Sequence, residues 1–352
     1  MPDFSIGVDM GGTNLRIAAI SANGHMLEKV TLSTKVAMGP DHVITEMCDA
    51  IRRLTAQHRS GGKFLGAGLG IPGIIDLDTG TIRKSANLPG FSEYPVHAEI
   101  ERRLETRVRL DNDGNVAGIG EQWLGAARGF PNIAMLTLGT GIGGAIIING
   151  KIFPGMNGMS GEFGHVTVEP EGYPCGCGNR GCAERYASAT GTVRMAQEAI
   201  AAGEAPSLAK AASGDPEFGA KSIYDLAEQG DEAARRIFRR FGRALGIMMA
   251  GIVNTLNLEM YVIGGGVSSA WNAFAPTMFE EMRERSLVYA VTAPDDPIAE
   301  DRIRYEAGLR NENKLKNEPT PATAGRKKLT IVTRAILGSD AGLYGGARLA
   351  VL

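Results

Sequence analysis

The sequence has almost no net charge and no long apolar run. Its 37 Lys and Arg nearly balance its 39 Asp and Glu, which leaves a net charge of −2. This balance gives no electrostatic reason to expect nucleic acid or an anionic membrane as a partner. No stretch is as long and apolar as the roughly 18 residues that a membrane-spanning helix needs. We therefore expect no membrane segment.

A secretory leader and a spread of cysteines are also missing. The first residues, MPDFSIGVDMGG, have neither a basic region nor an apolar core, so no signal peptide is expected. Only four cysteines are present, and three of them lie within eight residues. Such usage is typical of a reducing compartment, and we predict a cytoplasmic protein. A chain of 352 residues is long for one core, so two domains are expected.

Glycine, in contrast, is abundant, with 48 residues in short clusters between apolar runs. Residues 4–33 read as three strands, the first two joined through DMGGTN and the third following Asn23-Gly24. The Gly-Gly-Thr turn offers backbone N–H groups and a hydroxyl to phosphate oxygens. Asp9 before it could hold Mg²⁺ through water. An ordinary hairpin explains this segment equally well.

Residues 133–152 repeat this pattern with the turn LGTGIGG, so each half of the chain carries one phosphate-type turn. Between them lies DNDGN, 111–115, where a strand gives way to a helix expected from about Val116. Ligands of α/β sheets collect at such junctions. Asp113 or Asn115 could instead cap the helix. Two turns and an acidic junction together favour two related lobes that hold a nucleotide.

The three clustered cysteines predict a metal site. Cys175, Cys177 and Cys182 are separated by glycines, and His165 precedes them by ten residues. Three Cys and one His form a common zinc-binding set. A disulfide with a spare thiol is the alternative, and His165 could be only a packed polar residue. Four protein ligands leave no open position for a reacting water, so the zinc would be structural.

Other segments yield simpler expectations. Helices are predicted over 41–59, with Cys48 as a packed thiol, and over most of 186–257, with the arginines at 235–243 on a solvated face. Residues 259–270 predict a strand, a glycine loop and a helix capped by Ser268 or Ser269. The polar stretch 306–328 reads as an exposed loop, and a last strand and helix follow it.

Four segments together resemble the ROK family of sugar kinases, and within it the bacterial glucokinases. They are DMGGTNLR (9–16), DNDGNVAGIGE (111–121), LGTGIGG (138–144) and EFGH…CGCGNRGCAE (162–184). The resemblance implies an α/β, two-lobed actin-like ATPase (ribonuclease H-like) fold with a hinged cleft. The small lobe would comprise 1–111 and about 338–352, and the large lobe 112–337.

The resemblance also implies roles for individual residues. Asp113 would be the general base. The sugar would be bound by Gly73, Asn112, Asp113, Glu162, His165 and Glu184. The nucleotide would be bound by Asp9, Gly11, Gly12, Thr13, Thr140, Gly141, Gly265 and Gly266. Zinc would be bound by His165, Cys175, Cys177 and Cys182. Asp111 departs from the family pattern, because many members have Glu there.

The implied activity is ATP-dependent phosphorylation of D-glucose at the 6-hydroxyl, with Mg²⁺ accompanying ATP, a structural zinc and a homodimeric assembly. Kinases for N-acetylmannosamine, N-acetylglucosamine or fructose share these motifs and remain alternatives. The family also contains sugar-responsive repressors, but these need an N-terminal helix-turn-helix, for which the residues before Asp9 leave no room. A catalytically silent sugar or nucleotide sensor is the remaining alternative.

Overall fold

The computed structural model of the chain describes residues 2–85, 87–311 and 328–352 and contains two five-stranded sheets of the same plan. The first has the order β3-β2-β1-β4-β7, from β1 (Phe4–Met10), β2 (Asn14–Ser21), β3 (Met26–Ser33), β4 (Phe64–Ile71) and β7 (Val108–Asn112). The second has the order β10-β9-β8-β11-β12, from β8 (Ile133–Leu138), β9 (Ile142–Ile148), β10 (Lys151–Ile152), β11 (Met260–Gly264) and β12 (Ile331–Arg334). In each sheet three antiparallel strands are followed by two that run parallel to the first. The duplication agrees with the related halves that the two glycine turns predict.

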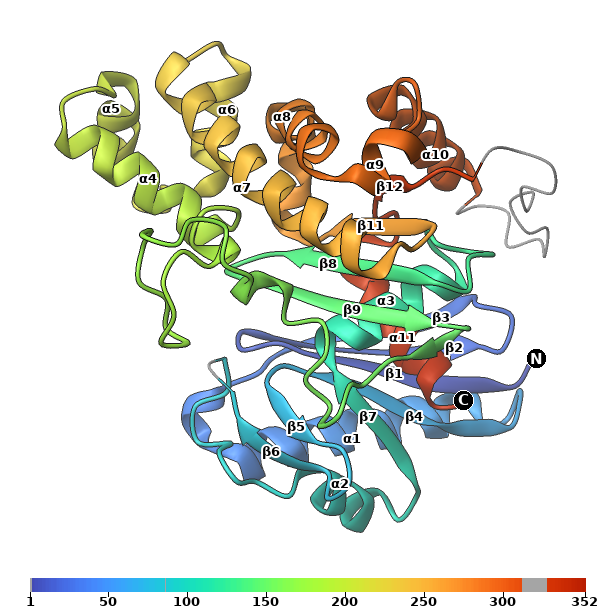
Figure 1. Cartoon of the computed structure of the whole chain (residues 1–352). Helices are drawn as coiled ribbons and strands as arrows, with labels where there is room; N and C mark the ends of the chain where they lie inside the picture. The colour runs from blue at the N-terminus through green and yellow to red at the C-terminus, as the bar shows by residue number, and fades with distance from the viewer. Residues whose placement is uncertain (1, 86, 312–327) are drawn as a thin grey trace.

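The sheets and helices are stacked in layers (Figure 1). Helices α3 (Asp113–Trp123) and α11 (Ala341–Leu349) lie between the two sheets, and α1 (Pro40–His58) and α2 (Val96–Leu104) cover the outer face of the first. The outer side of the second carries the helices α4 (Ala189–Ala201), α5 (Pro206–Gly214), α6 (Ala220–Glu228), α7 (Glu232–Leu256), α8 (Trp271–Arg285), α9 (Leu287–Thr292) and α10 (Pro297–Asn311). Of these, α5 packs against α4 and α6 and projects beyond the sheet at the upper left of Figure 1. A small hairpin, β5 (Ile74–Asp76) and β6 (Thr81–Lys84), follows β4.

Both faces of the second sheet are buried. Along β8, Ala134 and Leu136 join the cluster that includes α7 and α8, whereas Ile133 and Met135 join a separate cluster on the α3 side. Successive strand residues point to opposite faces, so a run that is apolar throughout is suited to a sheet covered on both sides.

The last helix packs against the first strand of the chain. The hydroxyl of Ser5 in β1 donates to the Ala347 carbonyl in α11 at 2.8 Å. The approach leaves no space for side chains, because a Cβ on Gly7 would lie 1.9 Å from the Leu343 carbonyl oxygen and a Cβ on Gly345 would lie 1.7 Å from that of Val116. Glycine is therefore required where α11 crosses β1 and α3.

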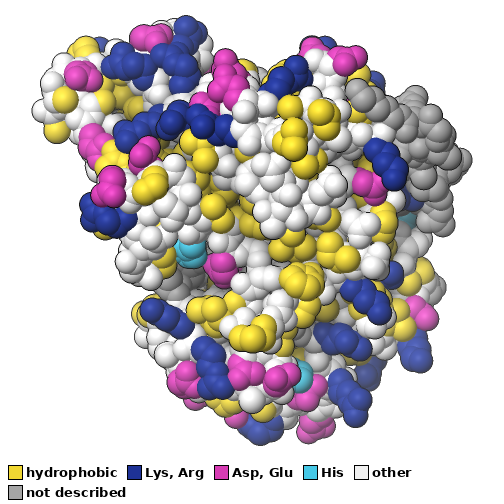
Figure 2. Space-filling view, in the orientation of Figure 1, with side chains coloured by type: hydrophobic (Ala, Val, Ile, Leu, Met, Phe, Trp, Pro, Cys, Tyr) yellow, Lys and Arg dark blue, Asp and Glu magenta, His cyan; other side chains and the backbone are white. Residues whose placement is uncertain are grey.

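Several sequence expectations are confirmed. The helix expected over 41–59 is α1, and Cys48 is buried within it, where burial raises the pKa of its thiol to about 11. The arginines at 235–243 lie on α7. Arg236, Arg239 and Arg243 have half-exposed side chains beside acidic partners, and basic side chains gather over α4–α7 in the upper left of Figure 2.

Within the parts of the chain that the structure describes, none of the helices is both long and apolar enough to cross a membrane.

Three local expectations are wrong. Residues 306–311 belong to α10 rather than to a loop, because Asp296 accepts hydrogen bonds from the N–H groups of Ile298 and Ala299 and so starts a helix at Pro297. The rest of the predicted loop, 312–327, lies outside the described residues. Helix α3 begins at Asp113, not near Val116.

Ser268 and Ser269 do not cap α8. They lie in the 3₁₀ helix η4 (Gly266–Ala270), where their hydroxyls donate to the carbonyls of Gly265 and Gly266. Helix α8 therefore begins after Ala270, with no side-chain cap. The lobe boundaries at 111/112 and 337/338 stay a prediction.

Candidate active site

The acidic residues of the candidate site lie where parallel strands of the first sheet end. Asp9 of β1 pairs with Gly70 of β4, and Ile71 of β4 pairs with Asn112 of β7. The carboxyl ends of these strands therefore share one edge, and Asp113 follows Asn112 at the start of α3. Ligands of α/β sheets bind at this edge.

A cleft of about 730 Å³ opens at this edge and is lined from both halves of the chain. Asp9 and Asp113 come from the first sheet and the junction after it, whereas Thr137 and the glycines of 264–266 come from the carboxyl ends of β8 and β11. The volume is within the range of pockets for small molecules and cofactors. The two halves therefore form one site that neither could form alone.

Asp113 has a strongly perturbed carboxyl group. Burial, together with the negative charges of Asp9 and Glu162, raises the pKa of Asp113 to about 6, although its Oδ1 accepts a hydrogen bond from the Gly114 N–H at 3.0 Å. The carboxyl is held by the α3 terminus, whose cap is the neighbouring Asn112: its Oδ1 accepts from the same N–H at 2.9 Å. The capping role that the sequence left open for Asp113 or Asn115 thus belongs to Asn112. Asp113 remains available to act on a ligand.

Asp9 faces the same cleft and is paired. Its Oδ2 lies 3.2 Å from Nη1 of Arg16, which also donates to the Ser339 carbonyl at 2.6 Å. Burial raises the pKa of Asp9, with the Arg16 charge acting in the opposite direction. A Cβ on Gly342 would lie 2.9 Å from the carboxyl carbon of Asp9, so the start of α11 lies directly against this group.

The two glycine turns join equivalent strands but are closed by different backbone hydrogen bonds. The Gly11 N–H donates to the Asn14 carbonyl at 2.8 Å, and the Gly139 N–H donates to the Gly141 carbonyl at 2.9 Å. Each turn leaves a threonine exposed, Thr13 in the first and Thr140 in the second. The first turn is packed tightly, because a Cβ on Gly12 would lie 2.6 Å from the Asn87 carbonyl oxygen. Both predicted phosphate turns are therefore present as compact hairpin turns that expose a hydroxyl.

Asn112 and Gly73 are brought together as predicted. The Asn112 amide Nδ2 donates to the Gly73 carbonyl at 3.1 Å. Gly73 has a φ of 125°, and a Cβ there would lie 2.6 Å from the Lys84 carbonyl oxygen, so only glycine fits. This contact fixes the β4–β5 connection against the start of α3.

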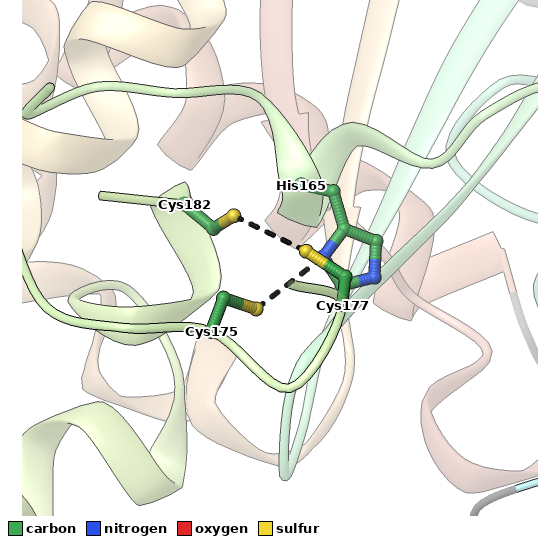
Figure 3. Close-up of side chains that lie close together, drawn as sticks. All are labelled: His165, Cys175, Cys177 and Cys182. Atoms are coloured by element: carbon green, nitrogen blue, oxygen red, sulfur yellow. Dashed lines mark hydrogen bonds between the residues drawn. The ribbon is translucent and has the colours of Figure 1, made fainter. Parts of the chain in front are cut away.

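The four predicted metal ligands converge on one point (Figure 3). The ligand atoms of His165, Cys175, Cys177 and Cys182 all lie within 4.8 Å of one another. The Cys177 and Cys182 sulfurs are 3.7 Å apart, and the Cys175 sulfur is 3.7 Å from Nδ1 of His165. Two sulfurs bound tetrahedrally at about 2.3 Å from one zinc ion would be about 3.8 Å apart. The donor set and its spacing therefore fit zinc, with His165 contributing Nδ1.

The metal-type cluster adjoins two acidic side chains. Glu184 Oε1 lies 3.7 Å from Nδ1 of His165, and Glu162 Oε2 lies 3.8 Å from Nε2 of the same ring. Glu184 also contacts the second glycine turn, because a Cβ on Gly141 would lie 2.6 Å from its Oε2. The loop that carries the thiols thus places Glu162, His165 and Glu184 beside a phosphate-type turn.

Sequence reasoning missed several residues of the cleft. Arg16 stands inside the DMGGTNLR segment, where its opposite charge seven residues after Asp9 was a usable signal. Tyr305, Arg334 and Gly342 had no such signal, because they reach the cleft from α10, β12 and α11 through tertiary packing. Among the predicted nucleotide residues, Asp9, Gly265 and Gly266 line the cleft itself.

Comparison with known proteins agrees with this geometry. The sequence matches the family model described as "ROK family" over residues 5–310. The chain belongs to the ROK family. Its relatives include a glucokinase of Halalkalibacterium halodurans, 36% identical over 98% of this chain and 94% of that protein, and one of Thermotoga maritima, 38% identical over 81% and 87%. A ROK family glucokinase of Streptomyces griseus, solved with glucose and AMPPNP, superimposes with a TM-score of 0.72 at 29% identity, covering 98% of each chain. The predicted two-lobed actin-like ATPase fold is thereby confirmed.

Proposed function

We propose that this ROK protein is an ATP-dependent hexose kinase that phosphorylates D-glucose at the 6-hydroxyl. The observation that carries the proposal is the carboxyl of Asp113, whose raised pKa of about 6 places it near neutral pH inside a cleft lined from both halves. The relatives named glucokinase, and the relative solved with glucose and AMPPNP, support the same choice.

Asp113 would act as the general base. A sugar hydroxyl is a weak nucleophile, and a carboxylate within hydrogen-bond reach can take its proton as the new bond forms. The 6-oxygen would then bond to the γ-phosphorus while the bond from that phosphorus to the β-phosphate oxygen breaks. The products are glucose 6-phosphate and ADP, and Asp113 later releases the proton to water.

Phosphoryl transfer depends mainly on alignment and on neutralising charge. The turns that contain Gly11–Thr13 and Thr140–Gly141 would hold the phosphates with backbone N–H groups and hydroxyls. Mg²⁺ bound with ATP would supply positive charge to the phosphate oxygens. Asp9, which lines the cleft at the end of β1, would hold this ion through water. Gly265 and Gly266 would lie near the adenosine.

The sugar would be oriented by Asn112, Glu162, His165 and Glu184. These carboxylates and hydrogen-bonding groups suit a neutral ring rich in hydroxyls and would repel an acidic substrate. We further propose that zinc bound by His165, Cys175, Cys177 and Cys182 holds this loop in place. His165 would bind zinc through Nδ1 and turn Nε2 toward Glu162 and the sugar. Zinc-bound thiolates are also compatible with the reducing cytoplasm, which we propose as the location of the protein.

The choice of glucose rests on the relatives, so a panel of sugars is the deciding experiment. We expect ADP release with MgATP to give the highest kcat/KM for glucose among glucose, fructose, N-acetylglucosamine and N-acetylmannosamine. The product should be oxidised by glucose-6-phosphate dehydrogenase. A higher kcat/KM for another sugar would replace glucose as the substrate, and a product resistant to that dehydrogenase would overturn the position of transfer.

No turnover with any of these sugars would favour a sugar sensor over a kinase. A homodimer is a further part of the proposal. Sedimentation equilibrium should give about twice the mass of the 37.2 kDa chain, and a monomer at micromolar concentration would contradict it.

A further inference from the structure

A cluster of three side chains lies at the cleft wall beside the carboxyl end of β12 and has no role in the scheme above. Arg334 and Tyr305 line the cleft, and Asp301 of α10 lies behind Arg334. β12 is the edge strand, separated from β8 by β11. Two strand spacings of about 4.8 Å place the end of β12 roughly 10 Å from the end of β8 and its phosphate-type turn. This separation suits the distance from a nucleotide's phosphates to its base.

Asp301 fixes the direction of the Arg334 side chain. The Asp301 side chain is only 1% exposed, and its Oδ2 lies 2.9 Å from Nη2 and 3.0 Å from Nε of Arg334. Its Oδ1 accepts hydrogen bonds from the backbone N–H of Arg334 at 2.9 Å and from the Thr333 hydroxyl at 3.0 Å. Every polar contact of this buried carboxylate therefore serves to hold β12 and the guanidinium in one position.

The side chains of Arg334 and Tyr305 stack against each other, and both line the cleft. The guanidinium carbon lies 3.9 Å from the centre of the Tyr305 ring, which is stacking distance. The glycines of the β11–η4 connection line the same cleft. A Cβ on Gly266 would meet no atom of the described residues within 4 Å, so bare backbone leaves open space there. Stacked planar side chains that line the cleft beside open space are suited to contact with a planar ligand group.

We infer that Arg334 and Tyr305 form the wall on which the purine base of the phosphoryl donor stacks, with Asp301 as the residue that positions Arg334. The inference rests on the proposed function and adds specificity for the donor to it. Aromatic rings and arginine planes both bind nucleobases by stacking, with little dependence on the edge of the base. The Nε–Nη2 edge of Arg334 is already occupied by Asp301, so the wall recognises a flat ring. Purines, which offer the larger face, should bind better than pyrimidines.

Direct binding of AMPPNP, measured by calorimetry, tests the wall without needing turnover. Tyr305→Ala and Arg334→Met should each raise the Kd of AMPPNP about tenfold or more, while leaving the Kd of inorganic tripolyphosphate unchanged. Arg334→Met leaves the buried Asp301 without its partner and could unfold the protein, but Tyr305 is only partly buried, so its variant keeps the test decisive.

Arg304→Met is the matched control. The Arg304 side chain is 22% exposed, as is that of Arg334; it lies 2.7 Å from Glu300 and its guanidinium carbon lies 5.9 Å from the centre of the Phe130 ring. Arg304 is not among the described residues that line the cleft. We expect its variant to bind AMPPNP as wild type does.

Asp301→Asn tests the positioning role. It should raise the KM for ATP while kcat stays within about twofold and the KM for glucose is unchanged, because only the donor wall is disturbed. A fall in kcat with no change in the KM for ATP would contradict that role.

The outcomes separate this inference from the proposed function. An unchanged Kd of AMPPNP in Tyr305→Ala overturns the wall, and equal losses for AMPPNP and tripolyphosphate would show phosphate contact instead. If wild type binds AMPPNP through the wall but phosphorylates no hexose, only the proposed function fails. If wild type does not bind AMPPNP, both fail.

Discussion

Burial and the carboxylates of Asp9 and Glu162 raise the pKa of Asp113 to about 6. For this single residue, the raised pKa has two consequences: it favours catalysis and it disfavours folding. A general base works best when its pKa is near the working pH, so the shift favours proton abstraction from a sugar. An ionised carboxylate that is poorly solvated also destabilises the folded chain.

The first consequence is a predicted acid limit on activity. Only ionised Asp113 can accept the proton, so kcat/KM for glucose should fall as the pH drops through about 6. The profile should be measured with both substrates below their KM, since it then reports the free enzyme. An acid limb near pH 4, the range of an ordinary aspartate, would show that the raised pKa does not govern catalysis.

The second consequence appears in Asp113→Asn. The amide cannot accept the proton, so kcat should fall by about 10²–10⁴ or more while glucose still binds. Since the pKa is raised in the folded state, the ionised group reduces stability as the pH rises through about 6. The variant should therefore gain up to about 3 kcal/mol in the free energy of unfolding at pH 7.5 and little at pH 4.

Asp111→Asn is the control for this substitution. Asp111 is buried, but its Oδ1 accepts hydrogen bonds from the Asn115 amide and the Asn112 N–H, both at 2.7 Å, so its role is to support the junction. We expect its kcat to stay within about tenfold of wild type. If Asp113→Asn keeps more than about a tenth of wild-type kcat, Asp113 is not the base.

At the scale of elements, the thiol loop is predicted to act as one unit. Cys177→Ser should lower zinc content, thermal stability and glucose affinity together, because loss of one ligand releases the loop that carries Glu162, His165 and Glu184. Cys48→Ala, which removes a buried thiol of α1 outside the cluster, should leave zinc content unchanged. Pure wild-type protein without zinc, fully active after strong chelation, would contradict this role.

The crossing of α3 and α11 supplies a second test. Gly345→Ala would place a Cβ 1.7 Å from the Val116 carbonyl oxygen, so the helices must separate and stability should fall by several kcal/mol, about the cost of an overpacked core or more. Gly251→Ala is the control: it lies in α7, where a Cβ would meet no atom of the described residues within 4 Å. That change should stabilise by about 0.5–1 kcal/mol. Equal denaturation midpoints for the two variants would contradict the close crossing.

At the scale of the whole molecule, the proposed site is shared by both halves. Asn112 lies at the end of the first sheet, and Glu162 and Glu184 follow the hairpins of the second. A ligand that contacts both halves stabilises the arrangement of the two halves to which it binds. Glucose and MgAMPPNP together should therefore raise the melting temperature by more than the sum of their separate effects.

Gluconate is the control for this measurement, because its carboxylate would be repelled by the acidic site. It should neither raise the melting temperature nor add to the effect of MgAMPPNP. Strictly additive shifts with glucose and MgAMPPNP would show that the two ligands bind without coupling between the halves.

The sequence by itself determined the parts of this protein that depend on local spacing. Each of these parts is one short contiguous segment, so its chemistry can be predicted without knowing the fold. They are the two glycine turns, the acidic junction at 111–115 and the Cys-x-Cys-x4-Cys run. Most strands and helices followed from apolar periodicity, whereas β6, α2 and α9 were not predicted. Helix α10 was missed, although Asp296 and Pro297 form a starting signal, because its residues are mostly polar.

Only the tertiary structure decided what depends on residues far apart in the chain. The pKa of Asp113 depends on Asp9, which precedes it by 104 residues in the chain. The proposed donor wall joins Tyr305 of α10 to Arg334 of β12. Packing of α11 against β1 likewise brings Gly342 to Asp9. Burial and through-space charge act over distances of a few ångströms, and the order of residues does not specify those distances until the two sheets have formed.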